Sequence, residues 1–144
     1  MRLIASMIAL LIAGCVTPPK PRDPTVVVLQ TTKNKEAAVS DITKALSMKG
    51  FSIKSTDQNA GIVSTEPSAF NWQGGLGKLT FPGRSSAQIM IDGASVRVTI
   101  THECGVMNVI MGGGVTYQHC NGNDAVDVTR EKEKEFLEAV RSAL

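Results

Sequence analysis

Two runs of alternating apolar and polar residues flank the dipeptide Asp92-Gly93, and they constrain the fold more than any other feature of the chain. Strict alternation is typical of a strand with one buried face, and Asp-Gly is the strongest short signal for a tight hairpin turn. The sequence therefore predicts an antiparallel hairpin with one face in the core. Its expected inward positions are Ala87, Ile89, Ile91, Val96, Val98 and Ile100.

Further strands and two helices are expected around this hairpin. Residues 25–30, TVVVLQ, form an unbroken β-branched run, which is typical of a strand with much of both faces covered. A helical pattern then begins after the candidate N-cap Asn34 and stops at Gly50, which tolerates a left-handed φ. A second amphipathic helix is expected over residues 129–144, with an apolar side of Phe136, Leu137, Val140 and Leu144. Shorter strands are expected at residues 51–55, 62–66 and 115–120.

The expected element order is β-α-β-β-β-β-β-α. Two amphipathic helices can cover one face of an antiparallel sheet and leave its polar face to water. The fold class is therefore α+β, an antiparallel sheet with two helices packed on one face. Hydrophobic residues make up 42% of the chain, which suffices for one core, so residues 25–144 are expected to form a single domain.

The first fifteen residues, MRLIASMIALLIAGC, have the layout of a secretory signal peptide. One cation, Arg2, precedes an apolar run of about ten residues, which is too short to cross a bilayer as a helix. The residues that end it, Ile12-Ala13-Gly14-Cys15, resemble the lipobox of bacterial lipoproteins. The resemblance implies that residues 1–14 are removed and that Cys15 carries the acyl chains, such as palmitate, that anchor the protein in a membrane.

The residues after the cysteine indicate a location and a tether. Residue 16 is Val16 rather than the Asp that resembles an inner-membrane retention signal, so we expect the outer membrane, facing the periplasm. Residues 15–24 contain four of the six prolines in the chain. Because proline fixes φ and removes a backbone donor, this segment is expected to be an extended, semi-rigid tether.

One local pattern resembles a known family of lipoproteins. The first expected helix and residues 50–66, GFSIKSTDQNAGIVSTE, are similar to a helix-strand-turn-strand unit of component C of the β-barrel assembly machine and of small outer-membrane lipoproteins like it. The matching features are Gly50-Phe51, Asp57 in the turn and Gly61-Ile62-Val63. The resemblance implies the same unit of fold and the same compartment. Component C has two such domains, whereas this chain has one.

The remaining cysteines, Cys104 and Cys120, form an even pair in an oxidising compartment, which predicts a disulfide. The ring would contain about seventeen residues and contribute roughly 3 kcal/mol. The alternative is a zinc or copper site, for which His102, Cys104, His119 and Cys120 are suitable ligand types. The adjacent His119 and Cys120 would, however, point to opposite faces of a strand. Outside a metal site, both histidines are expected on the polar face of the sheet.

Residues 67–83 gather three of the six aromatic residues of the chain. One interpretation is a hairpin that packs its rings on the domain's own core. The other is an apolar surface for a partner, since contiguous exposed apolar area usually marks an interaction site. The candidate partner-binding residues are Phe70, Trp72, Leu79 and Phe81.

Charge and motifs bound the function. Without residues 1–14 the chain loses Arg2 and keeps 14 cations against 13 anions, a balance too even to attract nucleic acid. No catalytic constellation or cofactor motif is recognised, so no enzymatic activity is expected. The sequence predicts a periplasm-facing, membrane-anchored lipoprotein that acts as a binding or envelope-assembly accessory with an envelope protein as partner. The alternative is a metal-binding periplasmic lipoprotein that uses the His102, Cys104, His119 and Cys120 loop.

Overall fold

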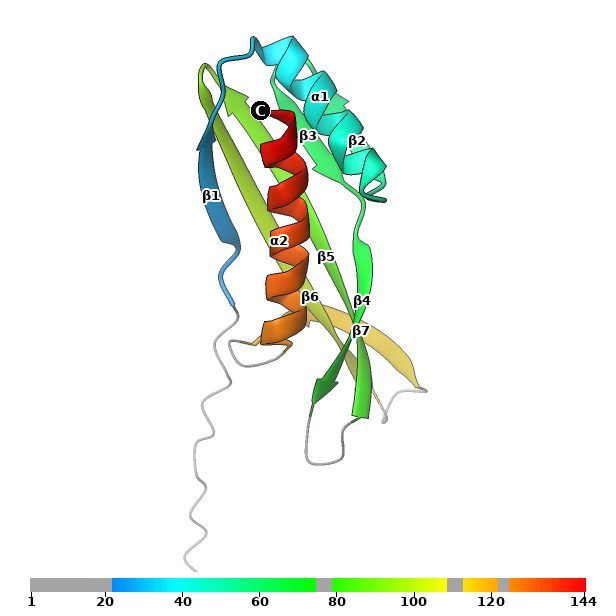
Figure 1. Ribbon diagram of the computed structural model, residues 1–144. Coiled ribbons are helices and arrows are strands. Elements are labelled where there is room, and N and C mark those ends of the chain that lie inside the picture. Colours follow the sequence, from blue (N-terminus) through cyan, green and yellow to red (C-terminus); the bar gives the residue numbers. More distant parts are fainter. Residues whose placement is uncertain (1–21, 75–78, 109–112, 122–124) are drawn as a thin grey trace, which may run out of the picture.

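A long hairpin forms the centre of the computed structural model, which describes residues 22–74, 79–108, 113–121 and 125–144 (Figure 1). Its strands, β5 (Leu79–Asp92) and β6 (Ser95–Asn108), have 14 residues each and pair antiparallel from the turn outward. Asp92 lies opposite Ser95, and Gly93 in the turn has a φ of 56°, which glycine adopts at no steric cost. The hairpin predicted from Asp92-Gly93 is confirmed.

Each outer edge of this hairpin is shared by two shorter strands. β1 (Thr25–Gln30) and β7 (Gly114–His119) pair with successive parts of β6. In the same way, β3 (Ile62–Thr65) and β4 (Ser68–Gly74) pair with successive parts of β5. β2 (Ile53–Asp57) adds to β3 and completes a sheet of seven antiparallel strands. β4 is additional to the predicted order, and it forms the hairpin that one interpretation of residues 67–83 expected.

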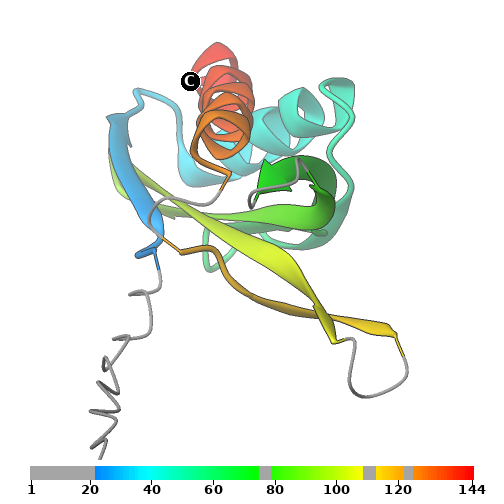
Figure 2. The same cartoon turned by 90° about the horizontal axis from the view of Figure 1, so that it is seen from below.

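Two helices, α1 (Lys35–Met48) and α2 (Val126–Ala143), cover one face of the sheet (Figures 1 and 2). Asn34 caps α1 as predicted, since its Oδ1 accepts a hydrogen bond from the backbone N–H of Ala37 at 2.8 Å. Gly50, with a φ of 86°, follows the helix. The predicted α+β architecture with two helices on one face is confirmed. Neither of the helices in the described ranges is long and apolar enough to span a membrane.

The coverage of β1 differs from the prediction. Val26 and Val28 are 55% and 54% exposed, while the alternate residues of the strand are half-buried. β1 is the last strand of the path β1-β6-β5-β3-β2, and the helices lie on only one side of it. Its unbroken apolar run therefore does not mean burial on both faces. β-branched residues also suit the exposed face of a strand.

The main core lies between the helices and the sheet. All six inward positions predicted for the hairpin are at most 4% exposed. Phe51, just after α1, stacks on Phe136 of α2 with ring centroids 4.0 Å apart, which ties the end of one helix to the other. The largest fully buried apolar side chains of this core include Phe136, Ile42, Leu46, Ile89, Ile91 and Ile100.

A second, smaller core lies under the beginning of α2. It contains Phe70, Trp72 and the two cysteines Cys104 and Cys120, with Phe81 packed against them. Trp72 and Phe81 face each other across the β4–β5 pair, and their ring centroids are 4.9 Å apart. A Cβ on the neighbouring Gly83 would come within 2.2 Å of the Phe70 ring, so only glycine allows this packing.

The second core corrects the predicted partner-binding surface. Phe70 and Trp72 are only 7% and 9% exposed, and Phe81 is half-buried, so these rings cannot form a free docking surface. The physical reason is the register of β4 on β5, which brings the rings together against the disulfide and Val128 of α2. Of the four predicted residues, Leu79 alone is exposed, at 61%.

Replacing Trp72 with Ala is therefore expected to destabilise the domain. The loss of a large buried ring should lower the free energy of unfolding by about 3 kcal/mol, measured by chemical denaturation. Leu79→Ala is the matched control, and it should change stability by less than about 0.5 kcal/mol because that side chain is exposed. Equal effects of the two substitutions would contradict the second core.

Candidate functional site

A cluster of buried polar groups separates the two cores. On the helix-facing side of β5 and β6, Ser85 and His102 are paired in register, between the pair Gly83–Cys104 and the pair Ala87–Ile100. Ser85 is fully buried and His102 is 5% exposed. Glu133 reaches the cluster from α2. We call Ser85, His102 and Glu133, together with Arg22, Thr25 and Thr129, the buried polar cluster.

Both ring nitrogens of His102 are hydrogen-bonded, Nε2 to α2 and Nδ1 to the neighbouring strand β5. Its Nε2 lies 3.0 Å from Glu133 Oε1, and its Nδ1 lies 2.7 Å from Ser85 Oγ. Because a carboxylate only accepts hydrogen bonds, Nε2 carries the ring proton and donates a hydrogen bond to Glu133, and Nδ1 accepts a hydrogen bond from the Ser85 hydroxyl. Burial lowers the pKa of His102 below 6.5, although the bond to Glu133 opposes this shift. The neutral ring therefore satisfies both of its partners.

Glu133 also holds the beginning of the domain. Its Oε1 accepts hydrogen bonds from Arg22 Nη2 at 3.0 Å and from Thr25 Oγ1 at 2.8 Å. Arg22 Nη1 donates to Thr129 Oγ1 at 2.5 Å, and the backbone N–H of Arg22 donates to the Cys120 carbonyl at 2.8 Å. Arg22, which was predicted to belong to the tether over residues 15–24, is thus fixed both to α2 and to the end of the β6–β7 hairpin, so the extended tether can reach no farther than residue 21.

Ser85, His102 and Glu133 are the residue types of a hydrolase triad, but their placement argues against that chemistry. A serine nucleophile must reach the substrate carbonyl, and Ser85 has no exposed surface. Its hydroxyl is fixed between the two cores. In this state of the domain the cluster can hold a proton and position chain segments, and it cannot present a nucleophile to a bound substrate.

The predicted disulfide between Cys104 and Cys120 is present and joins β6 to the residue after β7, with 4.8 Å between the Cα atoms. The proposed metal ligands are not brought together. Both sulfurs are used in the disulfide, His102 bonds to Ser85 and Glu133, and His119 is exposed on β7. Within the described ranges, no group of three or more His, Cys, Asp or Glu side chains is arranged to hold a metal ion.

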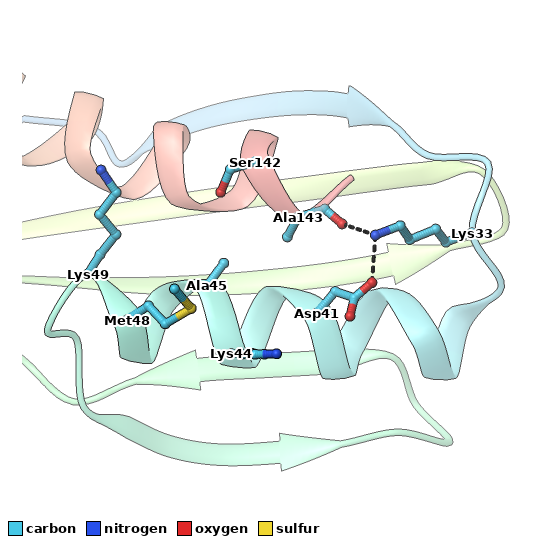
Figure 3. A pocket seen from close by; sticks show the side chains of 8 residues that line it. All are labelled: Lys33, Asp41, Lys44, Ala45, Met48, Lys49, Ser142 and Ala143. Atoms are coloured by element: carbon cyan, nitrogen blue, oxygen red, sulfur yellow. Dashed lines mark hydrogen bonds and ion pairs between the residues drawn. The ribbon is translucent and has the colours of Figure 1, made fainter.

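A pocket of about 380 Å³ lies between the two helices (Figure 3). Lys33 spans it at one end, donating to Asp41 Oδ2 of α1 at 2.5 Å and to the Ala143 carbonyl of α2 at 2.6 Å. Its other lining side chains combine cations with small or apolar groups: Lys44, Ala45, Met48, Lys49 and Ser142. Lys33 therefore fastens the end of α2 to α1.

The sheet face away from the helices mixes apolar side chains of β1, β5 and β3 with polar and charged side chains of β6. The strand register places Val28, Arg97, Met90 and Ile62 side by side across β1, β6, β5 and β3. Val28 and Met90 are 54% and 44% exposed, and Val26 stands beside this row at 55%. Both described helices pack on the opposite face (Figure 2). We call this surface the open face.

Comparison with known proteins identifies the fold and no more. No family model matches the chain, and no curated protein matches its sequence. A TBP-like protein from Parabacteroides distasonis ATCC 8503 has a similar crystal structure, with a TM-score of 0.55 at 7% identity over 84% of this chain and 94% of that chain. A DUF4468 family protein from Bacteroides ovatus ATCC 8483 has a TM-score of 0.42 at 9% identity, over 81% of this chain and 78% of that chain.

The buried polar cluster was not found from the sequence. His102 was expected on the polar face, but it continues the inward series that begins with Val96, Val98 and Ile100. Once Asp92 is placed opposite Ser95, counting outward along both strands pairs Ser85 with His102. That signal is present in the sequence. No sequence pattern predicts the roles of Glu133 and Arg22. Glu133 reaches His102 only through the packing of α2, and Arg22 in turn bonds to Glu133.

The buried His102 is expected to make stability depend on pH. In the unfolded chain His102 binds a proton near pH 6.5, whereas the folded protein holds the ring neutral to lower pH. The free energy of unfolding should therefore fall as the pH drops below about 6.5, by at most about 1.4 kcal/mol per pH unit, and level off below the folded pKa. His102→Gln should flatten this slope in denaturation curves measured between pH 7.5 and about 5. His119→Gln, on the exposed histidine, should keep it. Identical slopes in all three proteins would contradict the assignment.

Proposed function

We propose that this chain is a membrane-anchored lipoprotein of the outer membrane that faces the periplasm and acts as a non-enzymatic binding or envelope-assembly accessory. The lipobox-like residues Ile12-Ala13-Gly14-Cys15 and the proline-rich residues 15–24 support the anchor and the tether. Residues 1–21 lie outside the described ranges, so this support comes from the sequence. The Cys104–Cys120 disulfide supports an oxidising compartment, since such bonds are rare where thiols are kept reduced.

The observation that carries the binding role is the open face. On this face Val26, Val28 and Met90 are exposed around Arg97, and large apolar side chains beside a cation suit a protein partner that has both apolar and acidic groups. The partner would be an envelope protein that contacts β1, β6, β5 and β3. The resemblance of residues 50–66 to component C of the β-barrel assembly machine supports the periplasm-facing compartment. In the structure residues 50–66 follow α1 and form β2, a turn and β3.

The anchor is tested by Cys15→Ser. The substitution should leave the unprocessed precursor, because the acylated sulfur is lost, and mass spectrometry should find no lipid on the chain. The native protein should yield a mature chain that begins with acylated Cys15. A native chain that begins elsewhere, or that lacks lipid, would refute the anchor.

The binding surface is tested by a photo-crosslinking amino acid at Met90, with the same amino acid at Met48 as the matched control. Met90 is 44% exposed on the open face, and Met48 is 78% exposed on α1 at the opposite side of the domain. Irradiation of intact cells should give a discrete crosslinked product from position 90 and none from position 48. The same product from both positions, or from position 48 alone, would place the partner elsewhere.

A further inference from the structure

Two hairpins, β4–β5 and β6–β7, extend past the first turn of α2, at the end of the molecule opposite the C-terminus (Figure 1). Three large apolar side chains are exposed there: Leu79 on β5 is 61% exposed, Val106 on β6 is 43% exposed and Val115 on β7 is 40% exposed. We call these three side chains the hairpin tips. They are distinct from the open face, which lies along the other half of the hairpin.

The β6–β7 ribbon is exposed on both of its sides. Val106 lies opposite Thr116, while Val115 lies opposite Met107, so the two valines point to opposite faces of the pair. Figure 2 shows this ribbon projecting away from the helices. Since apolar side chains on both sides of a two-stranded ribbon have little core to enter, they are costly in water and suited to an apolar solvent.

The described parts of both hairpins also lack charge. Residues 68–74, 79–83, 105–108 and 113–118 contain no Asp, Glu, Lys or Arg, and in the sequence residues 75–78 contribute one cation, Lys78. Charge reappears one step along the strands, where Arg84 and Glu103 form an ion pair and Arg84 lies over the Tyr117 ring at 4.3 Å. From Leu79 through Phe81 to Arg84, β5 thus runs from aliphatic through aromatic to charged, which is the order of polarity from acyl chains to headgroups.

The position of the tether brings this end close to the membrane. Arg22 bonds to Cys120, whose own N–H bonds to the His102 carbonyl, so the domain begins at the level of His102. From Cys104 to Asn108 the β6 strand extends about 13 Å farther toward the tips. The seven residues from Cys15 to Arg22 span at most about 22 Å if extended with a PPII-like rise. The tether is therefore long enough for the tips to reach the bilayer, and the Asp92-Gly93 turn lies at the far end.

We propose that the hairpin tips Leu79, Val106 and Val115 insert into the lipid bilayer that holds the anchor. The proposal rests on the proposed function for the placement of the tether. For the tips it rests on their exposure and on the absence of acidic residues from residues 68–83 and 105–118 of the sequence. The tips and the acyl chains of Cys15 then form two separate contacts with one membrane. The domain stands upright on it, and the open face and the helices stay clear of the lipid.

The test measures the depth of a fluorescent probe in vesicles of phosphatidylethanolamine and phosphatidylglycerol. The lipoprotein with Leu79→Cys accepts a thiol probe only at position 79, since Cys15 is acylated and Cys104 is paired with Cys120. Brominated acyl chains should quench this probe. The control, Ala94→Cys, carries the probe in the turn at the opposite end and should not be quenched. Equal quenching at the two positions would overturn the proposal.

A second arrangement separates failure of the tips from failure of the anchor. Residues 15–144 with Cys15→Ser and an N-terminal histidine tag, held on nickel-chelating lipids, keep the tether without acylation. Quenching at position 79 in this form supports the tips even if Cys15 is never acylated. A probe at position 79 whose emission depends on protein density, with no effect of bromine, would show contact between copies and overturn the proposal.

The side chains themselves are tested with the probe at position 115, introduced by Val115→Cys. Leu79→Asp should weaken insertion of the tips by at least about tenfold, because a charge replaces a leucine that enters lipid. Met48→Asp, on the helix side, should leave quenching unchanged. Circular dichroism confirms that both variants are folded. Quenching that survives Leu79→Asp undiminished would show that Leu79 does not enter the bilayer.

Discussion

The register of the β5–β6 hairpin decides which side chains meet in this protein. With Asp92 opposite Ser95, one face of both strands carries Ile91, Val96 and their alternate neighbours into the main core. The same face then continues through the Ser85–His102 pair to Cys104 beside the second core. A slip of one residue would move every one of these side chains to the open face. The turn therefore fixes two cores and the polar cluster between them.

The sequence predicts the features that depend on neighbouring residues, but not the contacts between residues that lie far apart in the chain. Alternation, the cap at Asn34 and the cysteine count depend on neighbouring residues or on the compartment, and they predicted the hairpin, α1 and the disulfide correctly. Trp72 was ambiguous because its burial depends on where α2 begins and on the disulfide, which lie far along the chain. The predicted coverage of both faces of β1 was wrong for another reason. β-branched residues favour extended backbone whether or not other side chains cover them.

The buried polar cluster lets one domain hold two cores that do not merge. A buried carboxylate is costly unless its oxygens are bonded, and Glu133 Oε1 accepts from His102, Arg22 and Thr25. These partners come from the sheet and from the first residues of the domain, so Glu133 ties α2 to both. The cluster thus defines the angle at which α2 crosses from the second core to the main core.

The bonds of Arg22 also determine how a mechanical force on the N-terminal segment is transmitted to the domain. A pull on the N-terminal segment first reaches Arg22, whose backbone is bonded to Cys120 and whose guanidinium is bonded to α2. Cys120 in turn is covalently joined to β6. Tension therefore reaches α2 and Cys120 through the hydrogen bonds and the ion pair of Arg22, and the disulfide transmits it to β6. The edge strand β1 is not the first element that a pull loads. A pull on the N-terminal segment therefore does not begin to unfold the domain at β1.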